Sequence, residues 1–173
     1  MIYKFRIVSD EVDDFVRDIE IDSKSNFEQF HTIIQQSVCY EPWQLASFFQ
    51  VDHTWKKGTE ITLLDMGLGI THSVPMNKAI LKDYVQSKNQ KLIYVFDFFQ
   101  DRNFFIELIE IFMERNLEKP TVAYAAGEAP LQMLEDDFTV EQAGTNLLDD
   151  PLQSSYDFGD LDDYNEIFGE MLE

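Results

Sequence analysis

Residues 2–8 read Ile-Tyr-Lys-Phe-Arg-Ile-Val, and apolar side chains alternate along them with the charged Lys4 and Arg6. Residues 15–21 alternate in a similar way, and the polar segment at 10–13 separates the two runs. Alternation with a period of two is typical of a strand with one buried face, and a short polar connection is typical of a hairpin. The chain is therefore predicted to open with a β-hairpin.

A helix is predicted directly after the hairpin. Ser25 and Glu28 have the spacing of a capping box, which marks a helix start. Apolar side chains then recur on one side of the helix: Phe27, Phe30, Ile33, Ile34 and Val38. Pro42 marks the helix exit, and Trp43 after it is expected to anchor that exit.

The remaining pattern is mostly β. Strands are expected at 45–51, 60–64, 91–98 and 121–125, and a second helix at 76–85. Segment 104–113 carries glutamates at helical spacing, but its β-rich neighbours favour a strand. The predicted fold is α+β: a single domain with a mixed or antiparallel sheet, two main helices and a β-grasp-like hairpin–helix–strand opening.

Charge is distributed unevenly along the chain. The net charge is −20, and residues 120–173 contain fourteen acids and no Lys, Arg or His. This imbalance predicts a domain over residues 1–138 and an acidic extension over 139–173. It also disfavours direct binding to nucleic acid or to anionic lipid, because both require clustered Lys and Arg.

Other features suggest a cytoplasmic location. No apolar run approaches the roughly 18 residues of a membrane span, and the N-terminus lacks the pattern of a secretion signal. Cys39 is the only cysteine, so no internal disulfide can form, and we expect it to be a small buried apolar residue.

The extension contains a predicted amphipathic helix at about 161–172, with Asp160 as its N-cap. Its apolar side is formed by Leu161, Tyr164, Ile167, Phe168, Met171 and Leu172. Burying six such side chains stabilises by about 9–18 kcal/mol, and ordering the backbone costs about 12–24 kcal/mol. Because the two nearly cancel, the helix can pack on its own domain or enter the apolar or basic groove of a partner protein.

Four residues outside the extension are further candidates. Asp97 and Asp101 follow a strong strand and could hold a metal ion for hydrolysis, although an ion pair with Arg102 explains the same residues. Trp55, in a polar loop, is either a contact for a partner or packed on the domain. His31 is expected at the edge of the core, hydrogen-bonded to a strand, rather than as a ligand or base.

Several segments resemble the plasmid pRiA4b ORF-3-like family. The similarity includes the opening strands, Phe30-His31 on the helix and the stretch Ile-Tyr-Val-Phe-Asp-Phe at 93–98. Gly-Glu-Ala-Pro at 127–130 resembles the family's Gly-x-x-Ala-Pro loop. Where the family has Gly-Asp and then Trp, this chain has Phe99-Gln100 and then Arg102.

The resemblance implies an α+β fold and a cytoplasmic protein of bacteria or archaea, and it implies no particular activity, cofactor or metal. The sequence as a whole favours a non-enzymatic protein-binding or regulatory module that uses the acidic helix and Trp55. A metal-dependent hydrolase using Asp97 and Asp101 is the alternative from another class. An acidic mimic of nucleic acid, using the acids after Gly127, is a third hypothesis.

Overall fold

The computed structural model describes residues 1–64 and 73–134 of the 173-residue chain. The contacts within the chain define two units, Met1–Leu134 and Glu135–Glu173, and the first holds all the described residues. The predicted acidic helix at about 161–172 lies outside the described residues.

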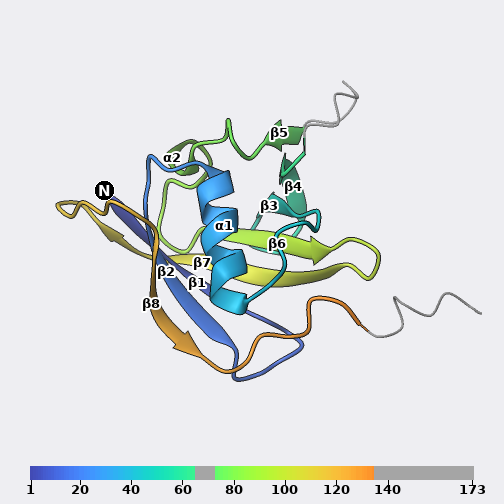
Figure 1. Cartoon of the computed structure of the whole chain (residues 1–173). Coiled ribbons are helices and arrows are strands. Elements are labelled where there is room, and N and C mark those ends of the chain that lie inside the picture. Colours follow the sequence, from blue (N-terminus) through green and yellow to red (C-terminus); the bar gives the residue numbers. More distant parts are fainter. Residues whose placement is uncertain (65–72, 135–173) are drawn as a thin grey trace, which may run out of the picture. The chain divides into compact units, whose positions relative to one another are not determined.

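The first unit is α+β, and its centre is an open, mostly antiparallel sheet (Figure 1). In the described residues the sheet has eight strands, in the order β5-β4-β3-β6-β7-β1-β2-β8. The strands are β1 Ile2–Val8, β2 Val16–Asp22, β3 Ser47–Val51, β4 Lys57–Thr62, β5 Ser73–Pro75, β6 Lys91–Asp97, β7 Arg102–Phe112 and β8 Thr121–Ala126. Among the described strands, β4 and β5 are the one pair that runs parallel.

The predicted strands are confirmed, with small shifts at their ends. The opening hairpin is β1 and β2, paired from Ile2↔Asp22 to Val8↔Val16. The segment predicted as a strand at 104–113 is β7, which pairs with both β1 and β6. In the sheet, β6 and β7 lie between β3 and the opening hairpin.

Helix α1, Phe27–Val38, lies across one face of the sheet (Figure 1). Its capping box uses Asn26 and Gln29, one residue later than predicted, because the backbone of Ser25 is engaged elsewhere. The N–H of Ser25 donates to Asp22 and its carbonyl accepts from Leu81. The capping chemistry is as expected, and only its position differs.

Aromatic rings fill the space between α1 and the sheet. Phe30 stacks on Phe48, with ring centroids 5.3 Å apart, and packs against the tilted ring of Phe5 at 4.6 Å. All three side chains are fully buried. Ring pairs at these separations add to the free energy gained by burial alone, so this cluster fixes α1 on the sheet.

The second helix is shorter than predicted. Instead of spanning 76–85, α2 covers only Leu81–Tyr84. The residues before it pair with the start of α1: Ile80 forms a β-bridge with Asn26, and the carbonyl of Ala79 accepts from Phe27. These pairings use backbone groups that a longer helix would need, so tertiary contacts override the local pattern.

Two expectations about the end of α1 are wrong. Cys39 is exposed, because it is the C-cap residue in the left-handed conformation with φ 56°. Trp43 is 65% exposed, so it does not anchor the helix exit. The anchor is instead Tyr40, which is buried and whose hydroxyl donates to the carbonyl of Pro130 at 2.6 Å.

Both helices of the described residues are too short to cross a membrane.

Candidate functional site

A buried arginine, Arg102, joins the β1–β2 connection, the β6–β7 turn and residues 131–132 at one end of the sheet. Arg102 begins β7, and its guanidinium donates from Nε and Nη2 to the two carboxylate oxygens of Glu11, at 3.1 and 2.9 Å. Nη1 donates to the carbonyl of Gln132 at 3.2 Å, and Nη2 also donates to that of Leu131. The group lies over the ring of Phe96, 5.1 Å from its centroid. A planar guanidinium can satisfy all these acceptors at once, whereas an ammonium group cannot.

Asp97 stabilises the turn that leads to Arg102. Its Oδ1 accepts from the backbone N–H of Phe99 and Gln100, at 3.0 and 3.2 Å. Its Oδ2 is buried, makes no hydrogen bond, and lies 3.7 Å from Nη1 of Arg102. The positive charge of Arg102 therefore offsets a carboxylate that is only 8% exposed.

Residues 127–132 form the third segment. Gly127 has φ +66°, and a Cβ there would lie 2.4 Å from the carbonyl oxygen of Asp14, so only glycine fits. Arg17 donates to the carbonyls of Ala126 and Gly127, at 2.7 and 3.1 Å. These contacts fix the course of the chain as it leaves β8.

Gln132 then ties this segment to the loop after α1. Its Oε1 accepts from the backbone N–H of Glu41 at 2.7 Å, and its Nε2 donates to the carbonyl of Glu41 at 2.9 Å. Burial raises the pKa of the neighbouring Tyr40, so its hydroxyl stays protonated as the donor to Pro130. The loop after α1, the β6–β7 turn and residues 127–132 are thus held in one place.

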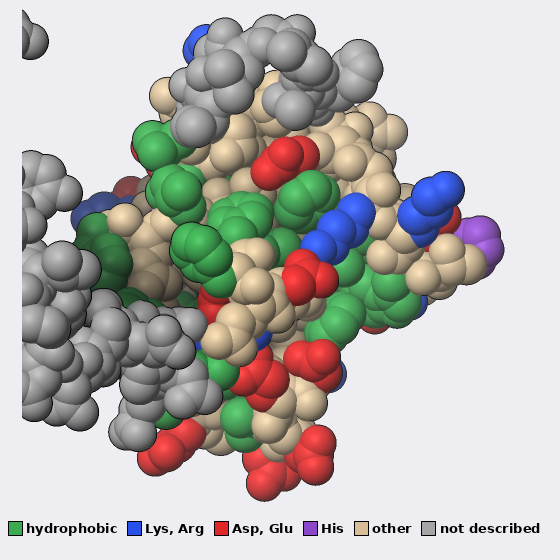
Figure 2. All heavy atoms as spheres, turned by 90° about the vertical axis from the view of Figure 1, so that its right-hand side faces the viewer, with side chains coloured by type: hydrophobic (Ala, Val, Ile, Leu, Met, Phe, Trp, Pro, Cys, Tyr) green, Lys and Arg blue, Asp and Glu red, His purple; other side chains and the backbone are tan. Residues whose placement is uncertain are grey.

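These three segments present an exposed apolar surface. Five of the eight large hydrophobic side chains that are exposed in the described residues belong to them, and Phe99 is completely exposed. We call this set the apolar end surface; its members are Trp43, Leu45, Phe98, Phe99 and Leu131. Figure 2 views the side on which the β6–β7 turn lies in Figure 1, and hydrophobic side chains gather there among acidic ones. Exposed apolar surfaces of this kind mark interaction sites, among them sites for protein partners.

Asp97 and Asp101 have separate partners. Whereas Asp97 is buried next to Arg102, the side chain of Asp101 is 74% exposed and pairs with Nζ of Lys57 at 2.8 Å. Within residues 1–64 and 73–134 no three His, Cys, Asp or Glu side chains are placed to hold a metal ion. The predicted ion pair with Arg102 is present for Asp97, whereas Asp101 pairs with Lys57 instead.

Trp55 packs on the domain. Its ring meets Phe105 edge to face, with centroids 4.9 Å apart, and Nζ of Lys91 lies 4.4 Å from its centroid. The loop is shaped by Asp52, which accepts from Thr54; hydrogen bonds from Thr54 and Lys56 lower the pKa of that carboxyl. Trp55 is half-buried in this arrangement.

His31 occupies the predicted place at the edge of the core. Its Nδ1 lies 2.8 Å from the hydroxyl of Tyr94 on β6, and Nε2 of Gln35 donates to the same hydroxyl. Burial lowers the pKa of His31 to about 4. The imidazole is therefore neutral near pH 7, and its hydrogen bond with the hydroxyl of Tyr94 is a structural role.

The other predicted contact residues lie in the acidic extension, outside the described residues: Leu161, Tyr164, Ile167, Phe168 and Met171.

The family described as plasmid pRiA4b ORF-3-like protein matches residues 1–136. The chain belongs to this family. A crystal structure of a protein of unknown function from Methanosarcina mazei Go1 has the same fold, with a TM-score of 0.58 at 20% identity, over 72% of this chain and 68% of that chain. No curated protein shows significant similarity to the chain.

Within this pRiA4b ORF-3-like fold, the ends of two segments that resemble family motifs, 93–98 and 127–130, meet at the apolar end surface. Arg102, which lies where the chain departs from the family pattern, joins the β6–β7 turn to residues 131–132 through its guanidinium. The sequence alone did not reveal this role of Arg102, because its partners are 29 to 91 residues away. One signal was available in the sequence. This chain departs from the family pattern by placing a charged residue, Arg102, directly after a turn.

Proposed function

We propose that the chain is a non-enzymatic protein-binding or regulatory module of the cytoplasm. One observation carries this proposal: the apolar end surface exposes five large hydrophobic side chains on segments that hydrogen bonds hold in place. A fully exposed phenylalanine such as Phe99 contributes no burial to the fold, but it gains burial when a partner covers it.

The rigidity of the support favours binding. Because Arg102, Gln132 and Tyr40 fix the backbone of all three segments, little conformational entropy is lost when a partner docks. The acids around the surface in Figure 2 favour a partner with an apolar centre and a basic rim.

The acidic extension supplies a second contact in this proposal. Its amphipathic helix at about 161–172 would place Phe168 and its apolar neighbours in a groove of the partner. Trp55 is a further contact. The extension and the apolar end surface make separate predictions, so each can fail without the other.

Affinity capture from native cells with matched variants tests the proposal. Phe99→Asp adds a charge to the apolar end surface, and Met113→Asp adds the same charge to another exposed apolar site, just beyond the far end of β7. We expect a partner that the wild type and Met113→Asp retain and that Phe99→Asp loses, with melting temperatures unchanged. Equal retention by both variants would remove this surface from the proposal.

A chain that ends at Asp150 tests the extension in the same experiment. Loss of the partner from this chain, with an unchanged melting temperature, supports the helix as a contact. A point variant, Phe168→Ala, separates apolar contact from charge: it should weaken binding without changing the dependence on salt.

A further inference from the structure

The outer edge of β8 is open. In the part of the chain that the structure describes, β8 is the last strand of the sheet and pairs only with β2. Four of its six residues are exposed: Thr121, Ala123, Tyr124 and Ala125. The backbone donors and acceptors on the outer edge of such a strand can pair with an additional strand.

β8 has few of the features that usually protect an edge. Its sequence, Thr-Val-Ala-Tyr-Ala-Ala, contains no charge and no proline, and its alanines allow another backbone to approach closely. One bulge interrupts its pairing with β2, opposite the step from Asp18 to Ile19. A bulge adds twist to the strand, but a twisted partner strand can follow it.

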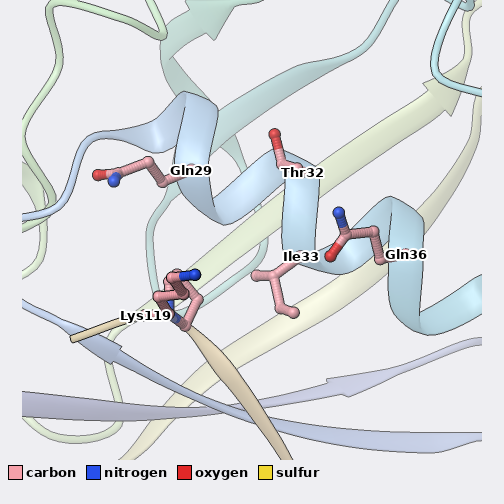
Figure 3. A pocket seen from close by; sticks show the side chains of 6 residues that line it. Gln29, Thr32, Ile33, Gln36 and Lys119 are labelled. Carbon is pink, nitrogen blue, oxygen red and sulfur yellow. The ribbon is translucent and has the colours of Figure 1, made fainter. Parts of the chain in front are cut away.

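A groove lies between α1 and the start of β8. The cavity has a volume of about 240 Å³, and its lining residues are Gln29, Thr32, Ile33, Gln36, Lys119 and Pro120. In Figure 3, Ile33 points from α1 into the space beside Lys119. A strand added to β8 would therefore run past an apolar position that can receive one of its side chains.

Charge indicates which strand could bind there. The chain carries a net charge of −20, and the exposed Glu118 and Glu128 flank β8 on either side, whereas Lys119 is the one charged residue among the described residues that line the groove. The net negative charge of the chain attracts a basic segment and repels a second copy of the same chain. The polar lining contributed by Gln29 and Gln36 offers further hydrogen bonds at the rim of the groove.

We propose that the edge of β8 and the adjacent α1 groove bind an extended basic segment of another protein, which joins the sheet as a further strand. Its backbone pairs with β8, and one of its apolar side chains enters the groove beside Ile33. This surface is separate from the apolar end surface and does not depend on it, so either can fail alone.

The test uses the full chain and a synthetic peptide of about eight residues in which Lys and Val alternate, with both terminal charges blocked. One control peptide carries Glu in place of Lys. A second control has N-methyl groups on alternate residues, so that it keeps its side chains but loses donors along one edge. Binding is measured at low salt, and hydrogen exchange is followed for the backbone amides of β8.

Thr32→Trp is the variant that fills the groove, because Thr32 is exposed and lines it. Glu28→Trp is the matched control, since Glu28 is exposed on α1 and does not line the groove. Melting temperatures of both variants establish that they fold.

We expect the basic peptide to slow exchange of the β8 amides by about tenfold or more at saturation, and to leave the amides of β5 unchanged. Thr32→Trp, the Glu peptide and the N-methylated peptide should each weaken binding by at least about tenfold, and Glu28→Trp by less than about twofold. The proposal is overturned by absence of binding, by binding without protection of β8, or by binding that tolerates N-methylation. Protection of β8 that rises with protein concentration alone would identify a second copy as the occupant and would also overturn it.

Discussion

Replacing Arg102 by methionine should destabilise the fold strongly. The change keeps an apolar stem over Phe96 but removes the charge that faces Glu11 and the buried Asp97. It also leaves two carbonyl oxygens without their donor. Removing one partner of a buried ion pair costs about 3–5 kcal/mol. Because the side chain of Glu11 is 32% exposed and water can replace part of its pairing, we expect about 3 kcal/mol.

A loss of this size corresponds to a fall of about 10 °C in melting temperature for a domain of this length. Chemical unfolding in guanidinium chloride, followed by circular dichroism, measures it. Arg115→Met is the control, because Arg115 pairs with Glu20 at 3.1 Å from a side chain that is 53% exposed. That pair should contribute less than about 1 kcal/mol. Similar losses in the two variants would refute the assignment of Arg102 as the joint between the β1–β2 connection, the β6–β7 turn and residues 131–132.

Four further outcomes are expected. Gly127→Ala should lower the free energy of unfolding by about 2 kcal/mol or more, because the added Cβ meets the backbone of Asp14. Gly58→Ala is its control in the same unfolding assay. Its Cβ lies 3.3 Å from the nearest neighbour, so it should cost less than about 1 kcal/mol. Burial lowers the pKa of His31 to about 4 from 6.5, so the stability that it contributes is present above about pH 6.5 and is lost as the pH falls toward 4. His31→Gln should therefore lose less stability than the wild type between about pH 7 and pH 5, and equal losses in urea titrations would contradict this. A chain ending at Asp150 should melt as the full chain does; a clear drop would show that the extension belongs to the fold. Millimolar Mg²⁺ or Mn²⁺ should leave the melting temperature unchanged, whereas a higher melting temperature would support the hydrolase hypothesis.

The strands and α1 could be predicted because their signals are local. The alternation in residues 2–8 and the one-sided apolar pattern of 27–38 appear within single elements, and burial of those faces determines the structure. Even β7 was predictable from its neighbours, although its glutamates have helical spacing. Those glutamates lie on a strand paired on both sides, where backbone pairing outweighs a weak helical pattern.

The failures share a non-local cause. Residues 76–80 give up helical hydrogen bonds to pair with the start of α1, about 50 residues earlier in the chain. Cys39 is exposed because the left-handed turn at the end of α1 directs the chain towards Pro130, which Tyr40 then contacts. Neither event has a signature in the residues concerned.

The candidate site shows the same limit. Its aromatic and acidic residues were visible in the sequence, but the interpretation of Asp97 and Asp101 as a pair depended on their spacing alone. In the structure Asp97 pairs with Arg102, and Asp101 pairs with Lys57. Glu11, the carboxylate that hydrogen-bonds to Arg102, comes from the opening hairpin. A network that joins distant segments can be recognised only when their spatial order is known.

The division of roles at this end of the sheet is the reason to expect binding there. Support comes from polar groups that hydrogen-bond across the segments, chiefly Arg102 with Glu11, and Gln132 with the backbone of Glu41. The side chains that face outward, such as Phe98 and Phe99, add little to that support. An exposed phenylalanine on a mobile turn would be an ordinary feature of a loop, but here the turn is fixed by Asp97 and by its neighbour Arg102. Fixed backbone combined with uncovered rings lowers the entropic cost of docking and retains the gain from burial, which is the condition that a protein-binding surface has to meet.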